Sequence, residues 1–133
     1  MLLDTHALLW FGFGQGLSKA ADMAIDEALL ADGIYVSAVS AWEIETLVRV
    51  GRPSLSASPE AWFEMATAGS SIQVVSLDAD TAFAATNLPG DFHRDPADRF
   101  LVATARSLRV PIVTRDRHIL AYAAAGHVQA VAC

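Results

Sequence analysis

Four acidic residues stand where the pattern of this sequence changes between strand and helix. They are Asp4, Glu43, Asp98 and Asp116. A group of carboxylates is the kind of ligand set that binds Mg²⁺ or Mn²⁺, because these ions prefer oxygen donors. Whether the four acids can meet depends on the elements that carry them.

Residues 93–116 organise the rest of the chain. Asp95 and Pro96 are typical of a helix N-cap followed by the first helical position. Apolar residues then recur at helical spacing after Asp98, at Leu101, Val102, Ala105 and Leu108. Asp98 therefore begins the face that should point to the core, where a lone carboxylate must be paired, capped or bound to a cation. Asp95 is first a helix cap and only second a candidate ligand.

Short apolar and β-branched runs alternate with helical patterns. The predicted strands are 1–4, 34–36, 72–77, 110–114 and 128–132. The predicted helices are 6–11, 19–32, about 41–50, 59–68, 78–87, 96–108 and 117–124. Gly12 should end the first helix and open a glycine-rich loop, while Ser18 and Ser58 should cap later helices. The alternation predicts a single α/β domain, residues 1–133, with a central parallel sheet in a three-layer α/β/α arrangement.

The predicted topology brings the four acids to one edge of the sheet. Asp4 ends the first strand and Asp116 ends the fourth. Glu43 opens the helix after the second strand, and Asp98 opens the helix that leads to the fourth strand. Ligands of such folds bind outside the carboxyl ends of the strands. Carboxylates without a counter-ion would repel one another there by several kcal/mol. A divalent cation, Mg²⁺ or Mn²⁺, removes that repulsion.

Glu43 has two explanations that the sequence leaves open. Ser40 and Glu43 have the spacing of a capping box, which would make Glu43 purely structural. The alternative is that Glu43 is a metal ligand. Glu45 differs, because it precedes Arg49 by four residues and should form a surface ion pair with it.

Composition restricts the partners. The chain of 133 residues has a formal net charge of −6, with nine Lys and Arg against fifteen Asp and Glu. Nucleic acid is therefore not bound through a basic surface, and a phosphate partner needs a metal bridge or a subunit interface. Arginines flank the acids, among them Arg94, Arg99, Arg115 and Arg117. The sequence shows neither a leader segment nor a membrane span, so we expect a cytoplasmic protein.

Zinc chemistry has little support in the sequence. The single cysteine is Cys133, which excludes a cysteine cluster. The four histidines are scattered along the chain, at positions 6, 93, 118 and 127. Large side chains at Trp42, Trp62, Phe63 and Met65 are expected in the core or at a dimer interface.

Three segments together resemble the PIN-domain family, and more narrowly the VapC-type toxins of type II toxin–antitoxin pairs. They are LLDTHALLW near the start, SAVSAWEIETLVRVG in the middle, and DPADRFLVATA with PIVTRD near the end. The resemblance covers nearly the whole chain and places the four family acids on Asp4, Glu43, Asp98 and Asp116. It places polar supporting residues on Thr5, Ser40 and Thr114, and Asp95 and Arg99 lie beside these motifs.

The resemblance implies a metal-dependent endoribonuclease that acts as a toxin. It also implies a homodimer and a cognate antitoxin bound near the active site. The large apolar side chains named above place the expected dimer contact near residues 40–50 and 58–68. Such a nuclease would use Mg²⁺ or Mn²⁺ to activate water and stabilise charge on the phosphate.

Two other classes of function remain as alternatives. A phosphoryl-transfer domain would use Asp4 as its nucleophile, but this chain has His6 where one such family has a second aspartate, and it has no lysine on a later strand. A catalytically silent binding module would use the acids only as helix caps. Metal-binding calorimetry separates that module from a nuclease.

Overall fold

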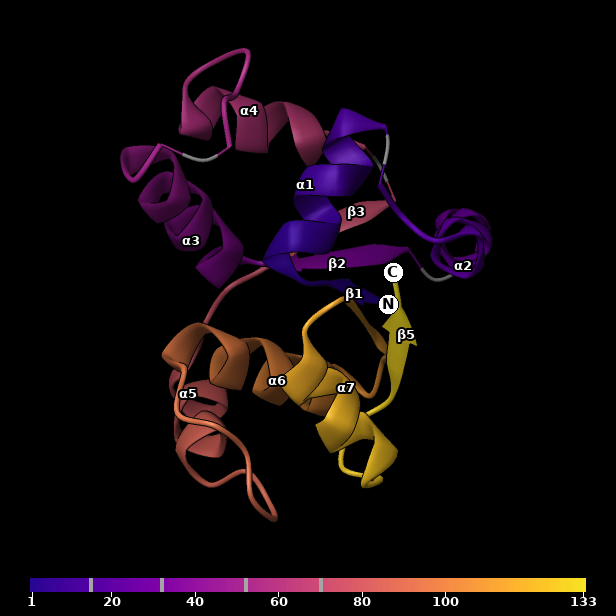
Figure 1. Ribbon diagram of the computed structural model, residues 1–133, viewed down its shortest axis with the longest axis vertical. Coiled ribbons are helices and arrows are strands. Elements are labelled where there is room, and N and C mark those ends of the chain that lie inside the picture. The colour runs from indigo at the N-terminus through magenta and orange to yellow at the C-terminus, as the bar shows by residue number, and fades with distance from the viewer. Residues whose placement is uncertain (15, 32, 52, 70) are drawn as a thin grey trace.

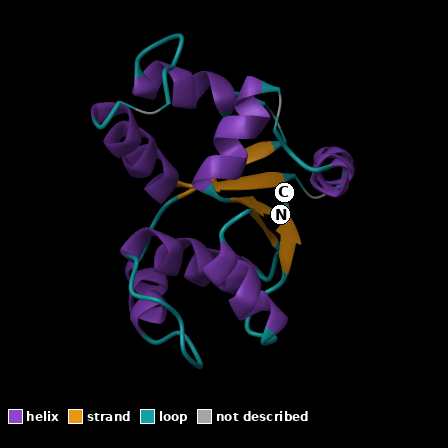
Figure 2. Ribbon diagram, in the orientation of Figure 1, coloured by secondary structure: helices purple, strands orange, loops and turns teal. Residues whose placement is uncertain are grey.

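The computed structural model describes residues 1–14, 16–31, 33–51, 53–69 and 71–133. Five strands alternate with seven helices in these ranges (Figures 1 and 2). The strands are β1 (Leu2–Leu3), β2 (Ile34–Ser37), β3 (Ile72–Val75), β4 (Ile112–Thr114) and β5 (Ala130–Ala132). The helices are α1 (Thr5–Phe13), α2 (Lys19–Leu30), α3 (Ala38–Arg49), α4 (Pro59–Ala66), α5 (Ala79–Thr86), α6 (Pro96–Leu108) and α7 (Arg117–Ala124).

The strands form one parallel sheet in the order β3-β2-β1-β4-β5. The shortest strand, β1, lies at its centre and pairs with both β2 and β4, so that Leu2 is aligned with Tyr35 on one side and Ile112 on the other. Both leucines of β1 are fully buried. Because successive side chains of a strand point to opposite faces, Leu3 and Leu2 belong to two different cores.

Helices cover both faces of this sheet (Figure 1). The core around Leu3 contains residues of α1, α2, α3 and α4, including Ile44 and Trp62. The core around Leu2 contains residues of α6 and α7, including Leu101 and Ile119. The predicted central parallel sheet in three layers is therefore confirmed.

The first helix is longer than the sequence predicted, because α1 continues through Gly12 to Phe13. A Cβ atom at Gly12 would lie 2.6 Å from a ring carbon of Trp62 on α4. The glycine thus permits a close approach of two helices and does not end the first one. The left-handed residue that caps α1 is Gly14, with φ of 66°.

Most other predicted boundaries differ from the structure by one to three residues, as is usual at element ends. Ser18 and Ser58 cap α2 and α4 as predicted. The predicted end of the second helix at Asp32 lies outside the described residues. Trp62 is a core residue with 5% of its surface exposed, whereas Trp42 and Met65 are about 60% exposed (62% and 61%). Among the described residues, no helix is long and apolar enough to cross a membrane.

Candidate functional site

One cavity at the carboxyl edge of the sheet collects the predicted acids. Its volume is about 410 Å³, and its lining comprises Asp4, Thr5, His6, Trp10, Glu43, Asp95, Asp98, Leu101, Arg115 and Asp116. All four acids named from the sequence, and Asp95 with them, line this acid cleft. A larger hollow of about 820 Å³ between α6, α7 and β5 has no carboxylate among its lining residues. We therefore place the chemistry in the acid cleft.

Asp4 is held at the junction of β1 and α1. It caps α1, because its Oδ1 accepts the main-chain N–H of Ala7 at 2.6 Å. Only 5% of its surface is exposed. Burial raises the pKa of Asp4, while hydrogen bonds from Ala7 and from the side chain of Thr114 act in the opposite direction. Asp4 therefore has a fixed orientation at the base of the cleft.

Asp116 is fixed in the same way at the end of β4. Its Oδ1 accepts the main-chain N–H groups of His118 and Ile119, at 2.8 and 3.0 Å, and so caps α7. Its own N–H donates to Thr114 Oγ1 at 2.9 Å. The buried hydroxyl of Thr114 thus contacts both Asp4 and Asp116, which fits the supporting position expected for it.

Helix α6 brings two acids into the cleft. Asp95 caps the helix as predicted, accepting the N–H groups of Ala97 and Asp98 at 3.0 and 3.2 Å. Within the described part of the chain, the Asp98 carboxylate accepts no main-chain N–H, and His93 Nε2 lies 3.0 Å from its Oδ2. Burial, and after it the charges of Asp116, Asp95, Glu43 and Asp4, together raise the pKa of Asp98 to about 7. This carboxylate is charged at neutral pH only at considerable cost.

The capping-box explanation of Glu43 is wrong. Helix α3 begins directly after β2, so its N-cap is Ser37, whose Oγ accepts the N–H of Val39 at 3.2 Å. Ser40 is already inside the helix and fully buried. Glu43 Oε2 instead accepts the hydroxyl of Thr5 at 2.5 Å, and Ser40 Oγ lies 3.0 Å from the same Thr5 oxygen.

Glu43 therefore has no capping function and faces the other acids. Burial raises its pKa, the Thr5 hydrogen bond opposes this, and the charge of Asp95 raises it again. Thr5 and Ser40, both predicted as supporting residues, lie directly behind the Glu43 carboxylate. By contrast, the predicted surface pair of Glu45 and Arg49 is confirmed, with a separation of 2.7 Å.

The two arginines nearest to the motifs have different surroundings. Arg99 does not line the cleft: its guanidinium donates to the carbonyl oxygens of Ala85, Phe92 and His93 at 2.8 to 3.0 Å. It anchors the segment before α6 and is not among the residues that the structure brings together at the site. Arg115 lines the cleft, with its guanidinium 4.1 Å from the ring centroid of Trp10.

The sequence analysis missed several residues at the cleft. His6 and Trp10 line it from α1, and the available signal was the spacing of four residues between them, which places both on one face of the helix that follows Asp4. The histidines are less scattered than the sequence suggested, because the rings of His93 and His118 stack with centroids 4.3 Å apart. His93 lies two residues before Asp95, which caps α6, and His118 lies two residues after Asp116, which caps α7. The starts of these two helices bring the histidines together.

The donor set of the cleft fits a hard divalent cation. Asp98 has four carboxylate neighbours that raise its pKa, and Arg115 is the single Lys or Arg among the described residues that line the cleft. Oxygen ligands grouped around a buried carboxylate suit Mg²⁺ or Mn²⁺, which accept such ligands and retain water. Asp4, Glu43, Asp98 and Asp116 are the residues that would hold the ion.

Comparison with known proteins agrees with this architecture. Residues 1–125 match the PIN domain family. Ribonuclease VapC22 of Mycobacterium tuberculosis (strain ATCC 25618 / H37Rv) is 33% identical over 120 residues, which cover 90% of this chain and 88% of that protein. A crystal structure of VapBC2 from Rickettsia felis, bound to a promoter DNA fragment, has a similar fold with a TM-score of 0.71 at 10% identity, covering 98% of this chain and 96% of the matched one.

A second solved structure has the same fold. It is VapC20 of Mycobacterium tuberculosis, described as a sarcin–ricin loop cleaving toxin, with a TM-score of 0.60 at 18% identity and 96% coverage of both chains. These two structures show only the shared fold. Family membership follows from the family match and from the 33% sequence identity to VapC22. The chain belongs to the PIN-domain family.

Proposed function

We propose that this protein is a metal-dependent endoribonuclease that hydrolyses RNA phosphodiester bonds as the toxin of a toxin–antitoxin pair. The observation that carries the proposal is Asp98, a half-buried carboxylate with four acids around it and a single histidine nitrogen, His93 Nε2, 3.0 Å from its Oδ2 among the described residues. Such a group calls for a cation. The relative VapC22 is named a ribonuclease, and VapC20 is described as a sarcin–ricin loop cleaving toxin.

In the proposed mechanism the protein residues hold and orient the reacting groups. Asp4 and Asp116 are fixed by main-chain N–H groups, Glu43 is fixed by Thr5, and Asp98 completes the set. A bound Mg²⁺ or Mn²⁺ would lower the pKa of the attacking water and offset charge on the phosphate and leaving oxygen. The capped acids keep their geometry without the ion, so the site is preorganised on the protein side.

Arg115 is the residue that we assign to the RNA phosphate. Its guanidinium is held by the main-chain oxygens of Cys133 and Gly16, at 2.7 and 2.5 Å, and lies over Trp10. No side-chain carboxylate pairs with it among the described residues. A fixed cation at the rim of an acidic cleft attracts the polyanion that the net charge of −6 would repel.

Lys19 offers no comparable support for the alternative phosphoryl-transfer function. It is exposed at the start of α2 and does not line the cleft. A phosphoryl-transfer site built on Asp4 would need a cation beside the phosphate, and a lysine does not supply one here.

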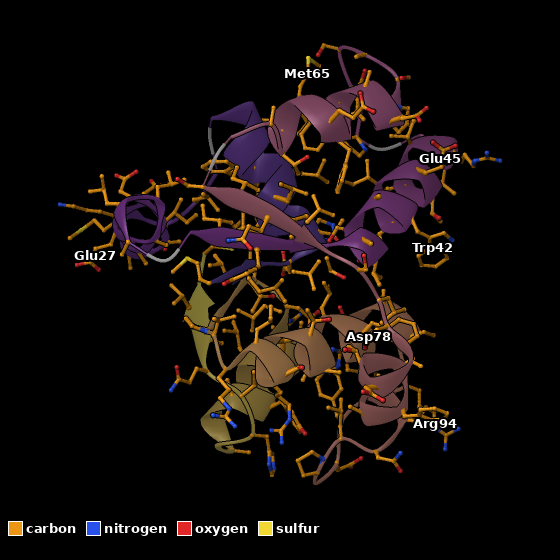
Figure 3. All side chains as sticks on the ribbon, turned by 180° about the vertical axis from the view of Figure 1, so that it is seen from behind. Glu27, Trp42, Glu45, Met65, Asp78 and Arg94 are labelled. Atoms are coloured by element: carbon orange, nitrogen blue, oxygen red, sulfur yellow. The ribbon has the colours of Figure 1, made fainter. Side chains whose placement is uncertain are left out.

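We also propose a homodimer and an antitoxin partner. Trp42 projects from the outer side of α3 (Figure 3), with 62% of its surface exposed. It lines an apolar groove together with Ala38, Val39, Leu77, Pro96, Ala97 and Phe100. Exposed apolar surface of this kind is typical of protein interfaces. A single domain of residues 1–133 and a cytoplasmic location remain part of the proposal, and sedimentation that shows only monomer at micromolar concentration would contradict the dimer.

The decisive experiment is cleavage of a mixed RNA pool by the purified protein with Mg²⁺, with Mn²⁺ and with a chelator. We expect cleavage only with metal, and none by the Asp4→Asn variant. Cleavage that continues unchanged in chelator would refute the metal mechanism. Calorimetry tests the remaining alternative, because a silent module whose acids only cap helices would bind no ion.

A further inference from the structure

Two histidines lie at the mouth of the acid cleft, next to its carboxylates. The rings of His93 and His118 are stacked, with an interplanar angle of 21°. His118 Nδ1 lies 3.6 Å from Asp116 Oδ1. One potential ligand atom from each of His93, Asp116 and His118 lies within 4.8 Å of the others. The cluster therefore offers nitrogen donors beside oxygen donors.

The ring nitrogen of His93 is the most informative atom of this cluster. His93 Nε2 is buried and has no hydrogen-bond partner. It lies 3.0 Å from Asp98 Oδ2, a separation that makes an ion pair only if the imidazole carries a proton on both nitrogens. Two ligand atoms of a tetrahedral Zn²⁺ ion are roughly 3.4 Å apart, since each is about 2.1 Å from the metal, so the observed separation is within a few tenths of an ångström of that spacing. A cation bound between them would satisfy both groups.

We propose that His93 and His118, with Asp98 and Asp116, form a mixed nitrogen and oxygen site for Zn²⁺ that adjoins the oxygen-only site of the cleft. Imidazole nitrogen binds Zn²⁺ well and Mg²⁺ poorly, so the histidines select between the two ions. Because the two sites share Asp98 and Asp116, Zn²⁺ and Mg²⁺ compete. This competition, unlike Zn²⁺ binding itself, rests on the proposed nuclease function.

The surroundings of each ring suit this role. His93 is held edge-on against Phe92, with centroids 4.5 Å apart, and 23% of its side chain is exposed. His118 has the more accessible ring, because 66% of its side chain is exposed on the first turn of α7. Zn²⁺ binding should therefore rotate His118 toward a fixed His93. The adjacent carboxylates offset the charge of the ion.

Zinc binding to the intact protein, without RNA, tests the inference. We expect calorimetry to find one Zn²⁺ per chain in excess Mg²⁺, with affinity lower by at least about 10-fold in His118→Ala and in His93→Ala, since even outer-shell partners cost 10- to 100-fold. His127→Gln is the matched control, because His127 stacks on Tyr122 away from the cleft. Equal Zn²⁺ affinity in wild type and both histidine variants would overturn the proposal.

Two further measurements separate the proposed zinc site from a folding defect and from zinc binding by Cys133. His118→Ala should have a melting temperature close to that of wild type, because the His118 side chain is exposed. If His93→Ala fails to fold, His118→Ala alone still tests the zinc site. Cobalt substitution reports the ligands: a thiolate charge-transfer band would assign the ion to Cys133 and contradict the site. We expect no such band, because burial raises the pKa of that thiol to about 11.

Cleavage assays separate the two proposals. If wild type cleaves RNA with Mg²⁺, Zn²⁺ should inhibit it, and His118→Ala should require a higher Zn²⁺ concentration for the same inhibition. If wild type binds Zn²⁺ through the histidines but cleaves no RNA, the nuclease function fails and the zinc site stands. If it cleaves RNA and Zn²⁺ inhibits both proteins equally, the zinc site fails and the nuclease function stands.

Discussion

The acids of the cleft form two groups that differ in their hydrogen bonds to the backbone. The capping acids Asp4, Asp95 and Asp116 each accept main-chain N–H groups at the start of a helix. The uncapped acids are Glu43 and Asp98, which accept no main-chain N–H in the described residues: Glu43 accepts the hydroxyl of Thr5, and Asp98 Oδ2 lies 3.0 Å from His93 Nε2. The capping acids contribute to folding whether or not an ion is present, because they satisfy otherwise free N–H groups.

The uncapped acids have no such role in the metal-free protein. Burial raises the pKa of both, and neighbouring carboxylates raise it further. Their charges therefore oppose folding until a cation binds. We infer that function, and not stability, accounts for their presence, and this contrast can be tested by substitution.

The largest expected effect is loss of RNA cleavage. Asp98→Asn and Asp4→Asn should each lower Mg²⁺-dependent cleavage by on the order of 100-fold or more, because even outer-shell partners cost 10- to 100-fold. The measurement is the single-turnover rate at saturating Mg²⁺. Asp80→Asn is the control, since Asp80 is an exposed first-turn acid of α5. Activity of Asp98→Asn near that of this control would remove Asp98 from the site.

Glu43→Gln tests the second uncapped acid. The amide keeps an oxygen that can accept the Thr5 hydroxyl but loses the charge. We therefore expect most of the activity to be lost, while the melting temperature stays within about two degrees of wild type, since a change of 1 kcal/mol shifts Tm by only about 4 °C in a domain of this size. Full activity in Glu43→Gln would leave three acids and make Asp95 the next residue to test.

Removing the Asp98 charge should have a smaller effect, on the stability of the metal-free protein. Its folded pKa of about 7 lies above the ordinary value of 3.8, so between these values the folded state binds more protons than the unfolded state. Stability should then fall as pH rises from about 4 to about 7. Asp98→Asn should show less of this fall and be the more stable protein at pH 8.

Urea unfolding in chelator across this pH range gives the measurement. Asp4 and Glu43 also have raised pKa values, so part of the slope should persist in the variant. A variant less stable than wild type at pH 8 would show that Asp98 supports the fold.

Hydrophobic pattern and helix signals were sufficient to predict the layers, the Asp95 cap and the edge of the sheet at which the acids meet. Asp95 followed by Pro96 has a local signature, and it is found as predicted. Contacts between distant segments have no such local signature. Thr5 contacts Glu43, and His93 stacks on His118, only in the tertiary fold. The local pattern at Gly12 predicts a helix end. The close approach of Trp62, which explains this glycine, is a tertiary contact that the local pattern does not contain.

The error at Ser40 leads to the smallest predicted effect. Ser37 is the true N-cap of α3, so Ser37→Ala should cost about 1 kcal/mol of unfolding free energy. Ser40→Ala should cost less, because Ala is favourable inside a helix and Thr5 can still donate to Glu43. Both differences should be independent of pH, unlike that of Asp98→Asn, since neither substitution changes a charge. Urea unfolding at pH 5 and pH 8 measures this, and a larger cost for Ser40→Ala than for Ser37→Ala would show that the buried hydroxyl pair, and not the cap, anchors the helix that carries Glu43.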